Sequence, residues 1–91
     1  STINLYKFGP VVSLHIVGWD ARGFVSSTNE YHNIGKTIPV GFKPPKTCFV
    51  DDVFADQHIV IGAEGGMNVR VSSNVGEGVT FNGQVSWITL E

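Results

Sequence analysis

The residues best suited to contact a ligand lie in residues 57–72, a stretch whose pattern predicts a β-hairpin, and at Asp56 directly before it. The loop Ala63-Glu64-Gly65 places a glycine where a three-residue hairpin loop needs a left-handed conformation. If Gly62 then faces Gly66, alternation of side chains gives each strand one apolar and one polar face. The polar face carries four candidate ligand-binding residues: Asp56, His58, Asn68 and Arg70.

His58 and Arg70 are the central pair of this predicted site, because they face each other across the hairpin. Both side chains can donate hydrogen bonds to sugar hydroxyls or to a phosphate. Asp56 can bind a pair of hydroxyls or offset the charge of Arg70.

The alternative to a ligand-binding site is that this polar face is an ordinary solvated outer face, since antiparallel sheets commonly expose one polar side. Both interpretations of the polar face stay open at this point.

The two tryptophans receive different predictions. Trp19 lies in a segment with glycines on both sides, next to Asp20 and Arg22, which favours a loop and exposure. An exposed indole is a platform for the apolar C–H face of a sugar, so Trp19 joins the candidate ligand-binding residues; its alternative role is to cover the end of a barrel. Trp87 alternates with Val85 on a terminal strand and is expected in the core or at a subunit interface.

Composition narrows the class of protein. Residues 1–91 are enough for one domain, expected to be a fragment of a longer protein because the chain lacks a start methionine. Six basic residues against eight acidic ones leave a net charge of −2, and the basic residues form no stripe. A nucleic acid partner is therefore not expected. No segment resembles a signal or a membrane span, so membrane insertion is not expected either.

Glycine and proline interrupt the chain about every dozen residues, which predicts an all-β fold of about eight short strands in a small antiparallel barrel or sandwich with a Greek-key-like order. Val12, Leu14 and Ile16 are expected on one buried face. Asp20 lies in a predicted loop before a short strand near Phe24-Val25. The remaining expected elements are a strand at residues 3–8, a polar loop at 26–33, an edge strand at 34–40, a stiff connector at 41–45, and strands at 48–54, 79–81 and 84–90.

Catalytic and metal-binding patterns are weak. Asp51 and Asp52 are adjacent, so on a strand they point to opposite faces and cannot act as a pair of carboxylates. The three histidines are scattered, and a metal site would need the fold to gather them. Cys48 is the single cysteine, which excludes a disulfide within the chain and favours a small buried side chain. No enzyme activity and no cofactor are expected.

Three fragments, in this order, resemble the pattern of phage tail-tip proteins. They are TIPVGFKPP at residues 37–45, the Glu64-Gly65 hairpin and VSWIT at residues 85–89. The resemblance is to the C-terminal head domain of lactococcal siphophage receptor-binding proteins, and it covers residues 34–91. It implies a β-barrel that forms a homotrimer in the virion, at the tail tip or baseplate. There the domain would be joined to other tail proteins and would bind host cell-wall saccharide without cleaving it.

The pocket of that family matches less well than its fold. It combines a histidine, an aspartate two residues later, a tryptophan on the returning strand and a later arginine. His58 matches the histidine, but Val60 occupies the place of the aspartate. Arg70 falls near the place of the tryptophan, and no arginine follows it. Two alternatives stay open: a structural trimerising module that binds no sugar, and a small hydrolase with carboxylates on facing elements.

Overall fold

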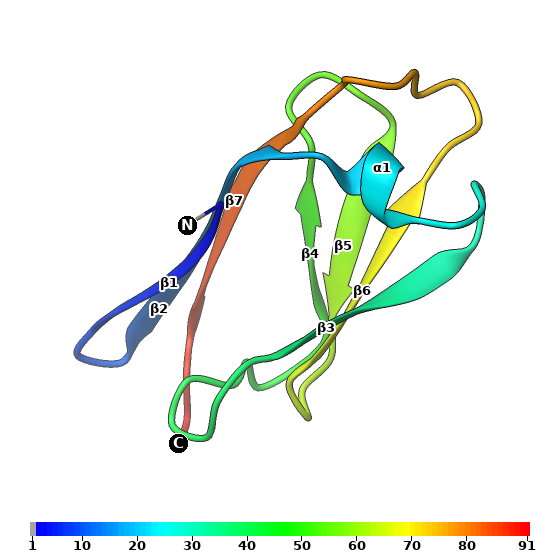
Figure 1. Cartoon of the computed structure of the whole chain (residues 1–91). Helices are drawn as coiled ribbons and strands as arrows, with labels where there is room; N and C mark the ends of the chain where they lie inside the picture. The colour runs from blue at the N-terminus through cyan, green and yellow to red at the C-terminus, as the bar shows by residue number, and fades with distance from the viewer. Residues whose placement is uncertain (1) are drawn as a thin grey trace.

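The computed structural model describes residues 2–91 and shows two antiparallel sheets, with one helical turn in the chain segment that connects them (Figure 1). The three-stranded sheet has the order β1 (Ile3–Phe8), β2 (Val11–Trp19), β7 (Phe81–Ile88). The four-stranded sheet has the order β3 (Tyr31–Thr37), β6 (Gly66–Val71), β5 (Gln57–Ile61), β4 (Cys48–Asp51). The helical turn α1 (Ala21–Phe24) joins the two sheets.

The four-stranded sheet is a Greek key. Strands β4, β5 and β6 follow one another as hairpins, and β3 lies beside β6 although residues 38–65, which include β4 and β5, separate the two strands in the chain. This order is the one that defines the motif. The expected class, a small all-β domain with Greek-key character, is therefore confirmed in the form of two packed sheets.

The core lies between the two sheets. Val12, Leu14 and Ile16 are almost completely buried, as their alternation on β2 predicts. Phe81 on β7 is fully buried, and Trp87 on the same strand is buried as well. The Trp87 indole donates a hydrogen bond to the Phe42 carbonyl oxygen at 2.7 Å, so its polar atom is satisfied. Burial of each large apolar side chain stabilises the fold by about 1.5–3 kcal/mol.

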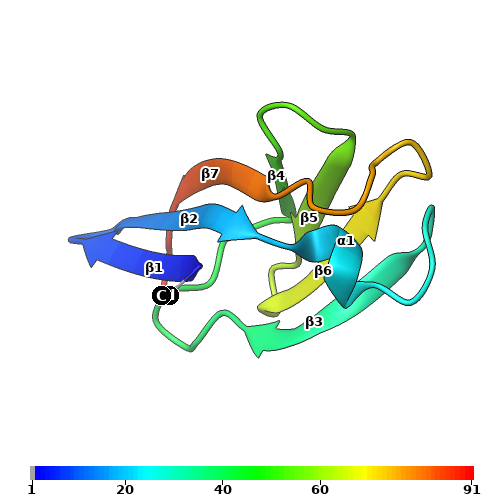
Figure 2. The ribbon, with the colours of Figure 1, turned by 45° about the horizontal axis from the view of Figure 1, so that its top comes forward.

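The sheets touch where β4 meets β7, and Figure 2 shows that the β1–β2 hairpin points away from this junction. Val53 N–H donates to the Asn82 carbonyl oxygen at 2.9 Å. Asn82 N–H in turn donates to the Asp52 carboxylate at 2.6 Å. A β-carbon added to Gly83 would lie 2.4 Å from the Asp51 carbonyl oxygen. The junction therefore depends on a residue without a side chain.

Several predicted boundaries were wrong around Trp19. This residue ends β2 and is half-buried, whereas the flanking glycines predict a loop. The strand expected near Phe24-Val25 is replaced by α1, in which Gly23 N–H donates to Asp20 Oδ1 at 2.9 Å. Aspartate before a helix accepts such a bond readily, and this local bond decides the conformation.

The boundaries of β3 and β4 also differ from the prediction. β3 starts at Tyr31, inside the expected polar loop, and ends at Thr37, before Pro39. Pairing with β6 extends this edge strand, and a register shift after Asn33 accommodates Gly35 at φ 77°. β4 stops at Asp51 because Asp52 turns the chain. The expected stiff connector contains a turn, in which Phe42 N–H donates to the Pro39 carbonyl oxygen at 3.1 Å.

Candidate ligand-binding face

The hairpin of β5 and β6 has the register that the sequence predicts. His58 pairs with Arg70, and Val60 pairs with Asn68. Gly65 adopts φ 100°, the left-handed conformation that the loop requires. The apolar residues of both strands point into the core, so the polar ones point outward. We call this side of the four-stranded sheet the outer face.

Two rows of side chains cross the outer face in register. The first row runs over β3, β6, β5 and β4 as Tyr31, Arg70, His58 and Asp51. The second row lies beside it and consists of Asn33, Asn68, Val60 and Phe49. Neighbouring strands are about 4.8 Å apart, so each row spans roughly 15 Å. That width matches a short oligosaccharide more closely than a single small ion.

His58 lies between two exposed aromatic rings. Tyr31 Oη and His58 Nε2 share a hydrogen bond of 2.7 Å, and the two rings meet edge to face at 5.5 Å. The Phe49 ring lies 6.1 Å from His58 on the other side. Tyr31 is 52% exposed and Phe49 is 53% exposed. The outer face therefore combines aromatic surface with hydrogen-bonding groups.

Sequence reasoning missed both aromatic residues. Phe49 could have been found, because a strand starting at Cys48 with Val50 buried must expose position 49. Tyr31 could not, since it falls in a stretch whose composition indicates a loop. It joins the face only through the pairing of β3 with β6.

Arg70 keeps most of its hydrogen-bonding capacity. Its Nη1 donates one long bond of 3.5 Å to Ser72 Oγ, and Ser72 Oγ donates to Asp56 Oδ2 at 2.7 Å. Asp56 is thus linked to Arg70 through Ser72, without a direct ion pair among residues 2–91. A guanidinium has five N–H donors, so several remain for a ligand.

Trp19, the fifth predicted site residue, is not brought to the outer face. It belongs to the three-stranded sheet, and its ring packs 6.3 Å from the buried Phe81 and 5.4 Å from Phe24. It therefore covers one end of the core, the alternative role considered for it. Asp56, His58, Asn68 and Arg70 do share one side of the hairpin.

The other reactive side chains lie apart from the outer face. His15 contacts Ser13 and Tyr6 on the three-stranded sheet, and His32 contacts Ser27. Within residues 2–91, no group of three or more His, Cys, Asp or Glu side chains is placed to hold a metal ion. Burial raises the pKa of the Cys48 thiol, which keeps it protonated.

The fold and the outer face define a Greek-key β-domain that displays aromatic and polar side chains together. No helix within residues 2–91 has the length and apolar content to span a membrane. Comparison with protein-family models, with curated proteins and with solved structures finds no match for this chain.

Proposed function

We propose that this chain is the saccharide-binding head domain of a phage receptor-binding protein, and that the outer face is its non-catalytic binding site. The observation that carries the proposal is the placement of His58 between exposed Tyr31 and Phe49, with Arg70 in the same row. The setting, at the tail tip or baseplate of a virion, is proposed from the resemblance of residues 34–91.

The chemistry of the outer face suits a sugar. The C–H face of a pyranose is apolar and packs on aromatic rings, whereas its hydroxyls both donate and accept hydrogen bonds. Tyr31 and Phe49 offer the rings, Arg70 offers donors, and Asn68 offers both kinds of group. The face is open and lies on strands, so its geometry is preorganised. Each single site could bind saccharide weakly in a homotrimer carried in many copies. Linked sites raise the effective concentration of saccharide at the next site, so the whole assembly would still bind tightly.

A structural module is the second candidate, and a different surface favours it. Phe8, Val11 and Ile88 form one row across the outside of the three-stranded sheet and are 78%, 42% and 59% exposed. An apolar row of this kind is suited to contact another subunit. A module of this type would assemble through that row and bind no saccharide.

The double substitution His58→Ala with Arg70→Ala tests the saccharide site. We expect binding on a glycan array to fall by about 30-fold or more, because two hydrogen-bonding groups, one of them charged, contribute about 2–3 kcal/mol together. Both side chains point outward, so the circular dichroism spectrum and the unfolding midpoint should change little.

The matched control is His15→Ala with Lys46→Ala, which removes one imidazole and one cation from other surfaces. It should bind the array like the unmodified chain. Unchanged binding by the His58 and Arg70 variant would refute the site. A chain that binds no glycan but assembles, and that becomes monomeric with Ile88→Lys, would support the structural module instead.

A further inference from the structure

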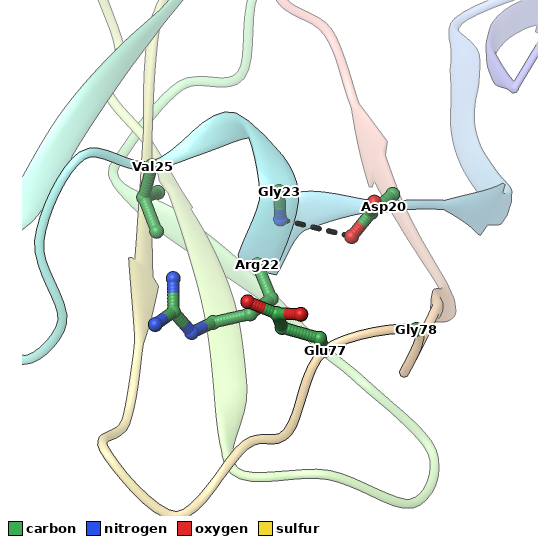
Figure 3. Close-up of a pocket in the computed structure, with 6 residues that line it drawn as sticks. All are labelled: Asp20, Arg22, Gly23, Val25, Glu77 and Gly78. Carbon is green, nitrogen blue, oxygen red and sulfur yellow. Dashed lines mark hydrogen bonds between the residues drawn. The ribbon is translucent and has the colours of Figure 1, made fainter.

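A hollow lies away from the outer face, between α1 and the loop that precedes β7 (Figure 3). Its volume is about 470 Å³, within the roughly 300–1,000 Å³ of typical small-molecule sites. Residues from both sides line it: Asp20, Arg22, Gly23, Val25, Glu77 and Gly78. The hollow therefore unites chain segments more than fifty positions apart.

Most of the charged atoms in this hollow have no hydrogen-bond partner within residues 2–91. Among residues 2–91, the side chains of Arg22 and Glu77 make no hydrogen bond and no ion pair, although both line the same space (Figure 3). Asp20 uses Oδ1 to accept from Gly23 N–H, and its Oδ2 accepts no hydrogen bond in this part of the chain. One cation and two carboxylates thus face a shared space with unused donors and acceptors.

The walls are held in place from each side. The bond from Gly23 N–H to Asp20 fixes α1, and the side chains of Ala21 and Val25 are buried in the core. On the opposite side Val75 is buried, and Gly78 adopts φ 83°, which turns the loop toward β7. Phe24 lies between two lining residues in the chain and is 47% exposed. The polar groups therefore extend from anchored backbone.

The mixture of charges selects the class of ligand. Two carboxylates and one guanidinium give these groups a net charge of −1, so they repel an anion such as phosphate, and Arg22 weakens their attraction for a simple cation. A pair of adjacent hydroxyls can bind the guanidinium and a carboxylate together, because one hydroxyl oxygen can accept from the guanidinium while the next hydroxyl donates to the carboxylate. We propose that this hollow is a second binding site, for a neutral saccharide unit with vicinal hydroxyls held by Arg22, Glu77 and Asp20.

This inference goes beyond the proposed function, since it concerns a different surface and different residues. It does not depend on the outer face binding a sugar. A chain with two such sites would contact two units of a polysaccharide, or two neighbouring strands, and gain avidity from the pair.

The test is a titration followed by amide NMR signals, with methyl glycosides of glucose, galactose, rhamnose and N-acetylglucosamine as probes. We expect at least one probe to shift the Gly23 and Gly78 signals in a saturable way, at millimolar concentration, as for a small site of a few hydrogen bonds. Arg22→Ala and Glu77→Ala should each weaken that titration by tenfold or more. The His58 and Arg70 double variant should leave it unchanged.

The same spectra separate the two proposals, because Asn68 and Arg70 report on the outer face. Both substituted residues of the hollow lie outside the core, and Glu77 is exposed, so signals elsewhere should show that the variants are folded. The proposal is overturned if no probe gives a saturable shift at Gly23 and Gly78. It is also overturned if the shifts persist in both variants, or if sodium phosphate produces them more strongly than any glycoside.

Discussion

Replacement of Gly83 by alanine is expected to lower the free energy of unfolding by about 2–3 kcal/mol, the upper range for overpacking. The new β-carbon would lie 2.4 Å from the Asp51 carbonyl oxygen and 3.1 Å from Val50 Cγ2. The first of these atoms is backbone, which cannot rotate away as a side chain can. Relief therefore requires β4 and β7 to separate, and their contact is what joins the two sheets.

Gly76→Ala is the matched control. Gly76 has no heavy atom within 4 Å of an added β-carbon and no positive φ. Its substitution should leave stability unchanged or raise it by up to about 1 kcal/mol, since alanine restricts the unfolded chain. Urea unfolding monitored by tryptophan fluorescence measures both variants. Equal midpoints for the two would contradict the assignment of Gly83 to the sheet junction.

Asp52→Ala is expected to have the other large effect, a loss of about 2–4 kcal/mol. The Asp52 side chain is only 9% exposed and bridges two elements. Oδ1 accepts from Asn82 N–H on β7, and Oδ2 accepts from Ala55 N–H in the turn after β4, each at 2.6 Å. Hydrogen bonds to a charged acceptor contribute about 1.5–3 kcal/mol, and their removal leaves partly buried N–H groups without partners.

The contribution of Asp52 should also depend on pH. Burial raises the pKa of this carboxyl, but the N–H groups of Asn82 and Ala55, with the Gln57 side chain and the Phe54 N–H, outweigh it and lower the pKa overall. A lowered pKa in the folded state means that the ionised form is stabilised there. Its contribution is complete above the pKa of the unfolded chain, about 3.9, and is lost as the pH falls through the lower folded value.

Urea midpoints between pH 7 and pH 2.5 measure this dependence. Asp52→Asn should be less stable at neutral pH and should lose less stability on acidification than the unmodified chain. The neighbouring Asp51→Asn is the control, because Asp51 is exposed on the outer face. If Asp51→Asn and Asp52→Asn altered the acid dependence equally, Asp52 would not be the group that couples pH to the sheet junction.

Local patterns predicted the parts of the fold that local physics controls. The alternation of Val12, Leu14 and Ile16 marked the buried face of β2, and a glycine at the third loop position set the register of the β5–β6 hairpin. Asp51 and Asp52 are expected on opposite faces of one strand; Asp51 is exposed at the end of β4, whereas Asp52 is buried but lies beyond the end of that strand. The first two of these features follow from residues a few positions apart, whereas the burial of Asp52 depends on its contact with Asn82.

The errors arose where distant segments compete with local preference. The polar composition of residues 26–33 indicates a loop, yet pairing with Arg70 on β6 draws Tyr31 into β3. The glycines around Trp19 indicate a loop, yet pairing of Trp19 with Phe81 extends β2. In these two places, backbone pairing and burial outweigh the preference of the short segment for a loop.

From the sequence by itself follow the all-β class, the hairpin register and the common outward direction of His58 and Arg70. Only the tertiary structure placed Tyr31 and Phe49 on either side of His58, and only it brought Arg22 and Glu77 to one hollow. The physical reason is that alternation and turn chemistry act over a few residues. The order of strands and the meeting of loops depend instead on how two whole sheets bury their apolar faces.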